Sequence, residues 1–407
     1  MFPRDLQYFK FCSYGFLKNL RFFDPFIILF FREVGLSFLQ IGVLISIREL
    51  TTTILEIPTG IIADVIGRKN AMLASFTSYI ISFIIFYFSS NFYYYILAMI
   101  IFASGEAFRS GTHKAMIVQY LKIKGLSDLK TEYYGHTRSW SQRGSALSSL
   151  IAGGLVLYSG SYRIVFLASI IPYILELFLM ASYPNELNGN RMKISGKSAF
   201  SSFRGFITSN DFRKGIFSSS IFAAAFKSVK DYLQPLLKST IVSIPILLTF
   251  SAKQRSSILV AIVYFFLFFL TAFASQNSGK FQKKMKSITK AMNVTFVIGI
   301  LVIIFAGATY HFQIYKIAII LFIILYLLQN LRRPLAMSYL SEIIPTEYTA
   351  TGLSIESQLK TILVTIFAPI LGFLADKFGI GKGIVIFSII LLILYPLAKL
   401  KNHSNLS

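Results

Sequence analysis

The feature that most constrains this chain is a series of long apolar segments along its whole length. Each is about as long as the roughly 20 apolar residues that a helix needs to cross a bilayer. The twelve segments cover residues 9–31, 38–62, 71–89, 92–115, 139–158, 164–183, 215–235, 257–275, 291–309, 313–336, 350–374 and 383–399. Of the 407 residues 55% are hydrophobic and 14% are charged. The sequence therefore predicts an all-α integral membrane protein with twelve transmembrane helices.

The distribution of Lys and Arg between the loops predicts the orientation. With the N-terminus in the cytoplasm, 21 basic residues lie on the cytoplasmic side and 8 on the opposite side. Because basic residues concentrate in cytoplasmic loops, both termini are expected to be cytoplasmic. This topology explains most of the formal net charge of +23, so nucleic acid is not an expected partner. We expect a multi-pass protein of the cytoplasmic (plasma) membrane that is a monomer in the lipid bilayer.

The longest polar stretch, residues 184–214, divides six segments from six. It begins with Pro184 and is rich in Ser, Gly, Asn and basic residues. A basic cytoplasmic linker at the midpoint is expected where two six-helix repeats follow each other. The sequence therefore predicts an N-terminal six-helix bundle over 1–183, a linker over 184–214 and a C-terminal six-helix bundle over 215–407.

Residue patterns that would carry enzymatic or metal chemistry are lacking. The sole cysteine is Cys12, the four histidines have no metal-ligand spacing, and there is no Gly-rich phosphate loop. We therefore expect no cofactor, no metal and no enzymatic activity. A membrane enzyme or receptor-like scaffold is an alternative of another class, but no nucleophile–base pair or metal set at one depth is visible.

Charged residues nevertheless fall inside the apolar segments, 11 basic and 7 acidic. A charge near the bilayer centre costs about 2.5–3.5 kcal/mol on insertion scales unless it is paired or hydrated. The charges occur on segments 1, 4, 7 and 10 and on 2, 5, 6 and 11, whereas segments 3, 8, 9 and 12 have none. We expect segments 1, 4, 7 and 10 to line a central cavity and segments 3, 9 and 12 to face lipid.

Several of these charges have the spacing of helical neighbours. The pairs are Arg21 with Asp24, Glu106 with Arg109, Lys227 with Asp231, and Glu356 with Lys360. The expected pathway of substrate and protons contains Arg21, Asp24, Glu49, Glu56, Glu106, Arg109, Lys227, Lys230, Asp231, Arg332 and Arg333. Any single pair could instead serve only to fix helix register.

Carboxylates among these charges are the candidates for proton coupling. The proton affinity of a carboxylate responds to burial and to a neighbouring Arg, so such a group can load and release a proton. The four candidates are Asp24, Glu49, Glu56 and Glu106. Which of them titrates is left open at this point.

The turn after segment 2 carries the most specific motif. Residues 60–69 read GIIADVIGRK, which resembles the helix 2–3 loop signature of the major facilitator superfamily, Gly-x-x-x-Asp-x-x-Gly-Arg-Lys/Arg. Gly60 permits close approach of helices, Gly67 a tight turn, and Asp64 can accept hydrogen bonds from helix N-terminal amides. The resemblance implies a gating loop, with Arg68 and Lys69 at the cytoplasmic face, that latches the two halves.

Other parts of the chain match the superfamily less closely. Residues 369–379, PILGFLADKFG, resemble a common ending of helix 11 in the family. The loop after segment 8, residues 278–284, keeps basic charge but lacks the Asp, so the C-terminal latch is expected to be degenerate. Segment 5 lacks the proline of the drug-antiporter pattern, although Gly153 and Gly154 keep small residues there.

The resemblance implies a secondary active transporter that works by alternating access, with two bundles rocking around a midplane site. A small organic substrate and proton coupling are expected on family grounds. Efflux of amphipathic drugs or metabolites is the first expectation. Import or exchange of an organic anion or nutrient is the alternative, because basic residues outnumber acidic ones 11 to 7 within the segments.

Overall fold

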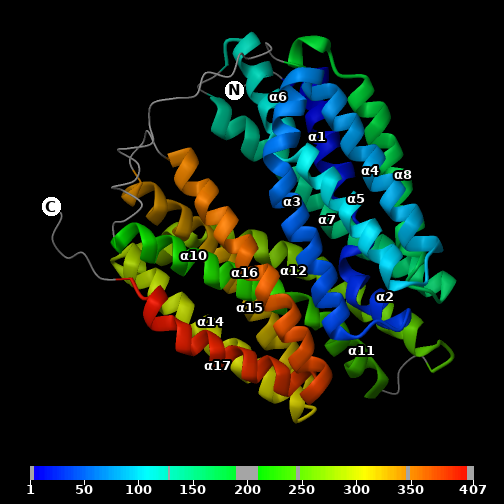
Figure 1. Cartoon of the computed structure of the whole chain (residues 1–407), viewed down its shortest axis with the longest axis vertical. Coiled ribbons are helices and arrows are strands. Elements are labelled where there is room, and N and C mark those ends of the chain that lie inside the picture. The colour runs from blue at the N-terminus through cyan, green and yellow to red at the C-terminus, as the bar shows by residue number, and fades with distance from the viewer. Residues whose placement is uncertain (1–3, 127–128, 189–209, 244–247, 345–348, 401–407) are drawn as a thin grey trace. The chain divides into compact units, whose positions relative to one another are not determined.

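The computed structural model describes residues 4–126, 129–188, 210–243, 248–344 and 349–400, and every regular element in them is a helix (Figure 1). Nine of the predicted segments are single helices. They are α3 (Phe38–Ile66), α4 (Arg68–Phe88), α7 (Lys130–Ser159), α8 (Ile164–Ala181), α12 (Ala252–Gln276), α14 (Ile288–His311), α15 (Tyr315–Ile343), α16 (Thr349–Phe378) and α17 (Ile380–Ala398). The all-α prediction is therefore confirmed. Residues 189–209, most of the predicted linker, lie outside the described residues.

The other three predicted segments are interrupted, which the sequence analysis did not anticipate. Segment 1 consists of α1 (Leu6–Lys18), the 3-10 turn η1 (Asp24–Phe26) and α2 (Ile27–Glu33). Segment 4 consists of α5 (Phe92–Arg109) and α6 (Thr112–Ile123). Segment 7 consists of α10 (Asn210–Val229), η4 (Lys230–Tyr232) and α11 (Leu233–Ser243). Two short elements, η3 (Asn185–Asn188) and α13 (Ser278–Met285), lie between segments.

Each interruption has a local cause in the sequence. Pro25 lies in the first turn of η1 and has no N–H to continue a helix from α1. Gly111 takes a φ of +74°, a conformation that favours glycine and that ends α5. Pro235 cannot donate the hydrogen bond that an α-helix would send to the carbonyl of Asp231. Non-helical backbone at membrane depth is tolerated where protein or a wet cavity surrounds it.

The interruptions also explain the count of apolar helices. Among the described residues, eight helices are long and apolar enough to cross a membrane: α3, α4, α8, α12, α14, α15, α16 and α17. The four predicted segments outside this set are the three interrupted ones and α7, whose first half is polar. The predicted segments that are not long, apolar helices are thus mainly those that are interrupted and carry charges.

The chain divides into two compact units. Unit 1 contains Met1–Gly35, Ile47–Ile194 and Ile244–Phe268, and unit 2 contains Leu36–Ser46, Ser195–Ser243 and Phe269–Ser407. The start of α3 therefore belongs to unit 2 and the start of α12 to unit 1. The simpler division into bundles 1–183 and 215–407 stays a prediction.

The two units repeat the same helix pairings. In unit 1, α1 packs against α7 and α4 packs against α5 and α8. In unit 2, the helices six segments later make the corresponding pairs: α10 packs against α16, and α14 packs against α15 and α17. Such internal repetition is what tandem six-helix repeats produce.

Glycines let the start of α3 pack closely within unit 2 and the start of α12 pack closely within unit 1. In unit 2, a Cβ added at Gly42 would lie 2.4 Å from the Ala368 carbonyl oxygen, and one at Gly372 would lie 2.3 Å from that of Phe38. In unit 1, a Cβ at Gly153 would lie 2.3 Å from the Cβ of Ala261. Only residues without a side chain permit backbones to approach this closely.

Candidate functional site

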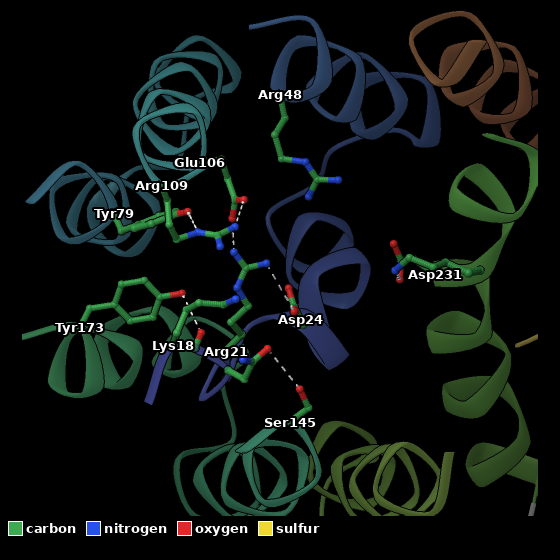
Figure 2. A network of polar contacts seen from close by, with 12 residues as sticks. Lys18, Arg21, Asp24, Arg48, Tyr79, Glu106, Arg109, Ser145, Tyr173 and Asp231 are labelled. Carbon is green, nitrogen blue, oxygen red and sulfur yellow. Dashed lines mark hydrogen bonds and ion pairs between the residues drawn. The ribbon is translucent and has the colours of Figure 1, made fainter. Parts of the chain in front are cut away.

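A cluster of charged side chains surrounds the break in segment 1. Arg21 lies in the break, forms an ion pair with Glu106 on α5, and has Nη1 4.0 Å from Oδ2 of Asp24 (Figure 2). Arg109 reaches the other oxygen of Glu106, with 2.6 Å between Nη2 and Oε2. The structure thus contains both ion pairs expected for this half. We call Arg21, Asp24, Glu106 and Arg109 the Glu106 cluster.

Aromatic side chains complete the Glu106 cluster. Nε of Arg109 donates to the hydroxyl of Tyr79 at 3.1 Å. The guanidinium of Arg21 lies 5.8 and 5.7 Å from the ring centres of Phe23 and Phe102, distances at which a cation is attracted to an aromatic face. Two cations and two carboxylates leave the cluster without net formal charge.

The other two predicted proton-carrying carboxylates lie on α3. Glu49 is buried and pairs with the neighbouring Arg48, 3.1 Å between Nη2 and Oε1. Glu56 is exposed and accepts a 2.6 Å hydrogen bond from Ser110 at the break in segment 4. Each of the four predicted carboxylates therefore has a polar partner. The assignment of a proton to one of them stays a prediction.

Unit 2 contains a cavity of about 370 Å³ with a strongly basic wall. Its charged lining residues are Lys227, Lys230, Arg332, Arg333, Lys360 and Glu356. They come from segments 7, 10 and 11. We call this cavity the basic pocket. Lys360 and Glu356 were not in the predicted pathway, although their spacing of four residues had singled them out.

The acidic residues at the basic pocket are already engaged. Asp231 pairs with Lys230, 2.6 Å between Oδ1 and Nζ, because both lie in the η4 turn instead of a regular helix. Glu356 accepts a 2.8 Å hydrogen bond from the hydroxyl of Ser219. The pocket wall thus has five basic side chains and one carboxylate, with Asp231 beside it on Lys230, and the region carries a positive excess.

Arg332 is the most buried of these basic side chains, with 2% of its surface exposed. It donates to neutral acceptors, the Met292 carbonyl and the hydroxyls of Thr295 at 2.8 Å and Ser218 at 2.9 Å. Its guanidinium carbon lies 4.9 and 5.3 Å from two ring centres, those of Phe222 and Phe296. Among the described residues no carboxylate forms an ion pair with it, and its Nε is buried without a hydrogen-bond partner.

The predicted gating loop forms a tight turn between α3 and α4. Gly67 has a φ of +92°, as its place in the motif predicts. Lys69 donates from its backbone N–H to Asn188 at 2.9 Å and from Nζ to the Tyr183 carbonyl at 3.0 Å. Arg68 donates to the Ala115 carbonyl at 3.4 Å. Asp64 is exposed, and within the described part of unit 1 a Cβ at Gly60 would meet nothing within 4 Å.

A second turn of the same kind lies between α16 and α17 in unit 2. Asp376 accepts hydrogen bonds from the backbone N–H groups of Phe38 at 2.9 Å and Leu39 at 2.8 Å, the first residues of α3. Gly379, three residues later, has a φ of +81°. A carboxylate at a helix N-terminus is stabilised by the helix dipole. In the sequence, residues 369–379 repeat the Asp-x-x-Gly spacing of the first turn. The sequence did not indicate which groups Asp376 would bind.

A family model described as Major Facilitator Superfamily matches residues 11–357, which is most of the chain. The chain belongs to the major facilitator superfamily. It is therefore a multi-pass membrane protein and a secondary transporter, and its family is one of transporters, not of enzymes. The prediction from the residue 60–69 motif is confirmed.

Known proteins are similar to this major facilitator over nearly its whole length. It is 24% identical over 403 residues to the "Uncharacterized MFS-type transporter YxaM" of Bacillus subtilis strain 168, covering 94% of this chain and 93% of the relative. Its fold is similar to the nucleoside transporter NupG, with a TM-score of 0.72, 13% identity and coverage of 97% and 98%. It is also similar to a bacterial homologue of the human lysosomal transporter Spinster in an inward-facing, unoccupied conformation, with a TM-score of 0.71, 15% identity and 97% coverage of each chain. These structural likenesses confirm the all-α major facilitator fold.

Proposed function

We propose that this transporter carries a small organic anion across the cytoplasmic membrane, coupled to protons. The observation that supports the proposal is the basic pocket, with five Lys or Arg residues and one carboxylate in its wall. A charge at membrane depth is costly unless it is paired or hydrated. A bound anion would relieve the excess and would thereby gain affinity from it.

The size of the basic pocket suits a small ligand. Ligand sites commonly enclose about 300–1,000 Å³, and this cavity measures about 370 Å³. Two Arg side chains line the pocket, and Arg suits a carboxylate or phosphate group because its donors form a planar fork. Carboxylate- or phosphate-bearing metabolites are therefore the favoured class of substrate.

Efflux of amphipathic cations, the first expectation from the sequence, has less support in this pocket. A cation would meet the repulsion of a net positive wall. We infer import or exchange of an organic anion instead. The transport pathway would run along the predicted residues of both units, and the gating loop would lie at the cytoplasmic face. Both termini would be cytoplasmic, and the protein would work as a monomer.

A thermal-stabilisation screen on the purified transporter tests this function. The probes are mono- and dicarboxylates, organic phosphates, uncharged nucleosides and the cation ethidium. We expect at least one organic anion to raise the melting temperature in a saturable manner. Stabilisation by ethidium alone would contradict the proposal.

A matched pair of variants connects that response to the basic pocket. Lys360→Gln removes one charge from the pocket wall, whereas Lys284→Gln removes one from an exposed position on α13. A charge-assisted contact contributes about 1.5–3 kcal/mol, so Lys360→Gln should weaken anion binding roughly 10- to 100-fold. Equal weakening in both variants would show that only overall charge matters and would refute the pocket.

A further inference from the structure

Glu176 on α8 is a buried acid that the Glu106 cluster and the basic pocket do not use. Its exposed surface is 0%, and neither carboxylate oxygen has a side-chain hydrogen-bond partner among the described residues. An ionised carboxylate without partners in an apolar bundle is far more costly than a neutral acid. A group in this position must therefore pair with a cation or carry a proton.

The face of α8 that holds Glu176 packs against α1. Tyr173, one turn before it, donates to the Lys18 carbonyl at 3.4 Å. Tyr183, two turns after it, donates to the Lys10 carbonyl at 3.3 Å. Glu176 lies between these two contacts on the same helical face. Lys18, in the last turn of α1, is its strongest charged neighbour.

Groups from several helices surround this acid. The charged and titratable residues that act on it or on its neighbours are Lys18 and Tyr14 on α1, Glu106 and Arg109 on α5, His113 on α6, and Tyr183 after α8. The ring of His113 stacks on Tyr14 with 3.4 Å between centres, and its Nε2 lies 3.2 Å from the Tyr183 hydroxyl. Glu106 also acts on Lys18 and Tyr14, but it is paired with Arg21 and Arg109. Lys18 is therefore the neighbouring cation that is left to balance Glu176.

Lys18 also lines a polar cavity of about 280 Å³. Its walls include Lys18 and His113 together with Asn19, Thr137, Arg138 and Gln142. A cavity of this size and polarity has room and partners for several waters. Lys18 thus lies between a space that can hold water and a carboxyl group that no described side chain solvates.

We propose that Glu176 binds the transported proton and that Lys18 passes it between Glu176 and the water of this cavity. In the empty state the pair is a Lys18 ammonium and a Glu176 carboxylate. A proton moves from the ammonium to the carboxylate, and the resulting Lys18 amine takes another proton from a hydronium ion. The loaded state is a Lys18 ammonium beside a neutral Glu176 acid, with one proton gained in total. This role rests on the proposed proton coupling.

Infrared difference spectroscopy of the purified full-length transporter tests the proposal without any substrate. Spectra recorded between about pH 5 and about pH 9, which brackets a shifted carboxyl titration, should contain the C=O band of a buried carboxylic acid. Glu176→Gln should remove this band, whereas the matched control Glu356→Gln should retain it. A band of unchanged size in Glu176→Gln would overturn the proposal.

A second variant keeps the test decisive if Glu176→Gln fails to fold. Lys18→Met removes the neighbouring positive charge, so the acid band should persist to higher pH than in the wild type. A Lys18→Met band that disappears at the wild-type pH would contradict the role of Lys18. No anion is added in the infrared experiment, so its result does not depend on the identity of the substrate. If no anion stabilises the protein in the thermal screen, the proposed function is refuted, but the proton site at Glu176 is not.

Discussion

The charged sites of the two units differ in how their charges are balanced. In unit 1, the Glu106 cluster pairs two Arg side chains with two carboxylates, and a third acid, Glu176, lies beside Lys18. In unit 2, five basic side chains and one carboxylate line the basic pocket, and Arg332 is buried with neutral acceptors only. A balanced site can gain and lose a proton, whereas a site with excess charge of one sign attracts a ligand of the other sign. The comparison therefore supports the proposal that protons bind in unit 1 and the anion in unit 2.

The largest effect is expected from removing the central acid of the balanced site. Glu106→Gln would leave Arg21 and Arg109 close together with only Asp24 as a counter-charge, and breaking a buried ion pair in this way costs about 3 kcal/mol or more. We expect a lower melting temperature and loss of transport. Glu356→Gln is the control, because Gln can still accept the Ser219 hydrogen bond. Equal destabilisation by both variants would remove the distinction between the two sites.

A smaller effect is expected at Arg332. Arg332→Lys keeps the charge but loses the fork that reaches Thr295 and Ser218 together, at a cost of about 2 kcal/mol. The neighbouring Arg333 is exposed, and Arg333→Lys should change stability by less than about 0.5 kcal/mol. Thermal unfolding of the two variants measures the difference. If Arg332→Lys is as stable as the wild type, the buried guanidinium does not hold unit 2 together.

The smallest effect concerns the two Asp-x-x-Gly turns. Asp376→Asn weakens the interaction of a full negative charge with the first amides of α3, worth about 1 kcal/mol. Asp64→Asn changes an exposed side chain, so we expect a change below about 0.5 kcal/mol. Hydrogen exchange at residues 38–42 should quicken in Asp376→Asn and stay unchanged in Asp64→Asn. The reverse order would contradict the role given to Asp376.

The sequence predicted those features that depend on local spacing. The apolar segments, the turn at Gly67 and the ion pair of Glu106 with Arg109 all follow from residues that are near one another in the chain. The breaks in segments 1, 4 and 7 were missed because an average over about 19 residues hides a single proline or glycine. Asp231 was paired with Lys227 on helical spacing, whereas its ion pair with Lys230 in the η4 turn was not predicted.

Features that depend on tertiary packing could not be predicted. Glu176 was one charge on an otherwise apolar segment, and its importance comes from Lys18, which lies 158 positions earlier in the chain. Likewise, the spacing of Asp376 and Gly379 indicated a turn, whereas the amides bound by Asp376 belong to residues more than 330 positions away. Such partners are fixed by the packing of the helices, which a single sequence does not display.

Transport in proteoliposomes under an imposed pH gradient tests the central claim most directly. The anion that stabilises the purified protein is radiolabelled and its uptake is compared for the wild type, Lys360→Gln, Glu176→Gln and the control Lys284→Gln. The account predicts accumulation driven by an inward proton gradient in the wild type and the control. It further predicts weaker apparent affinity in Lys360→Gln, and exchange of the anion without gradient-driven accumulation in Glu176→Gln. Gradient-driven movement of ethidium, with no response to any organic anion, would contradict it.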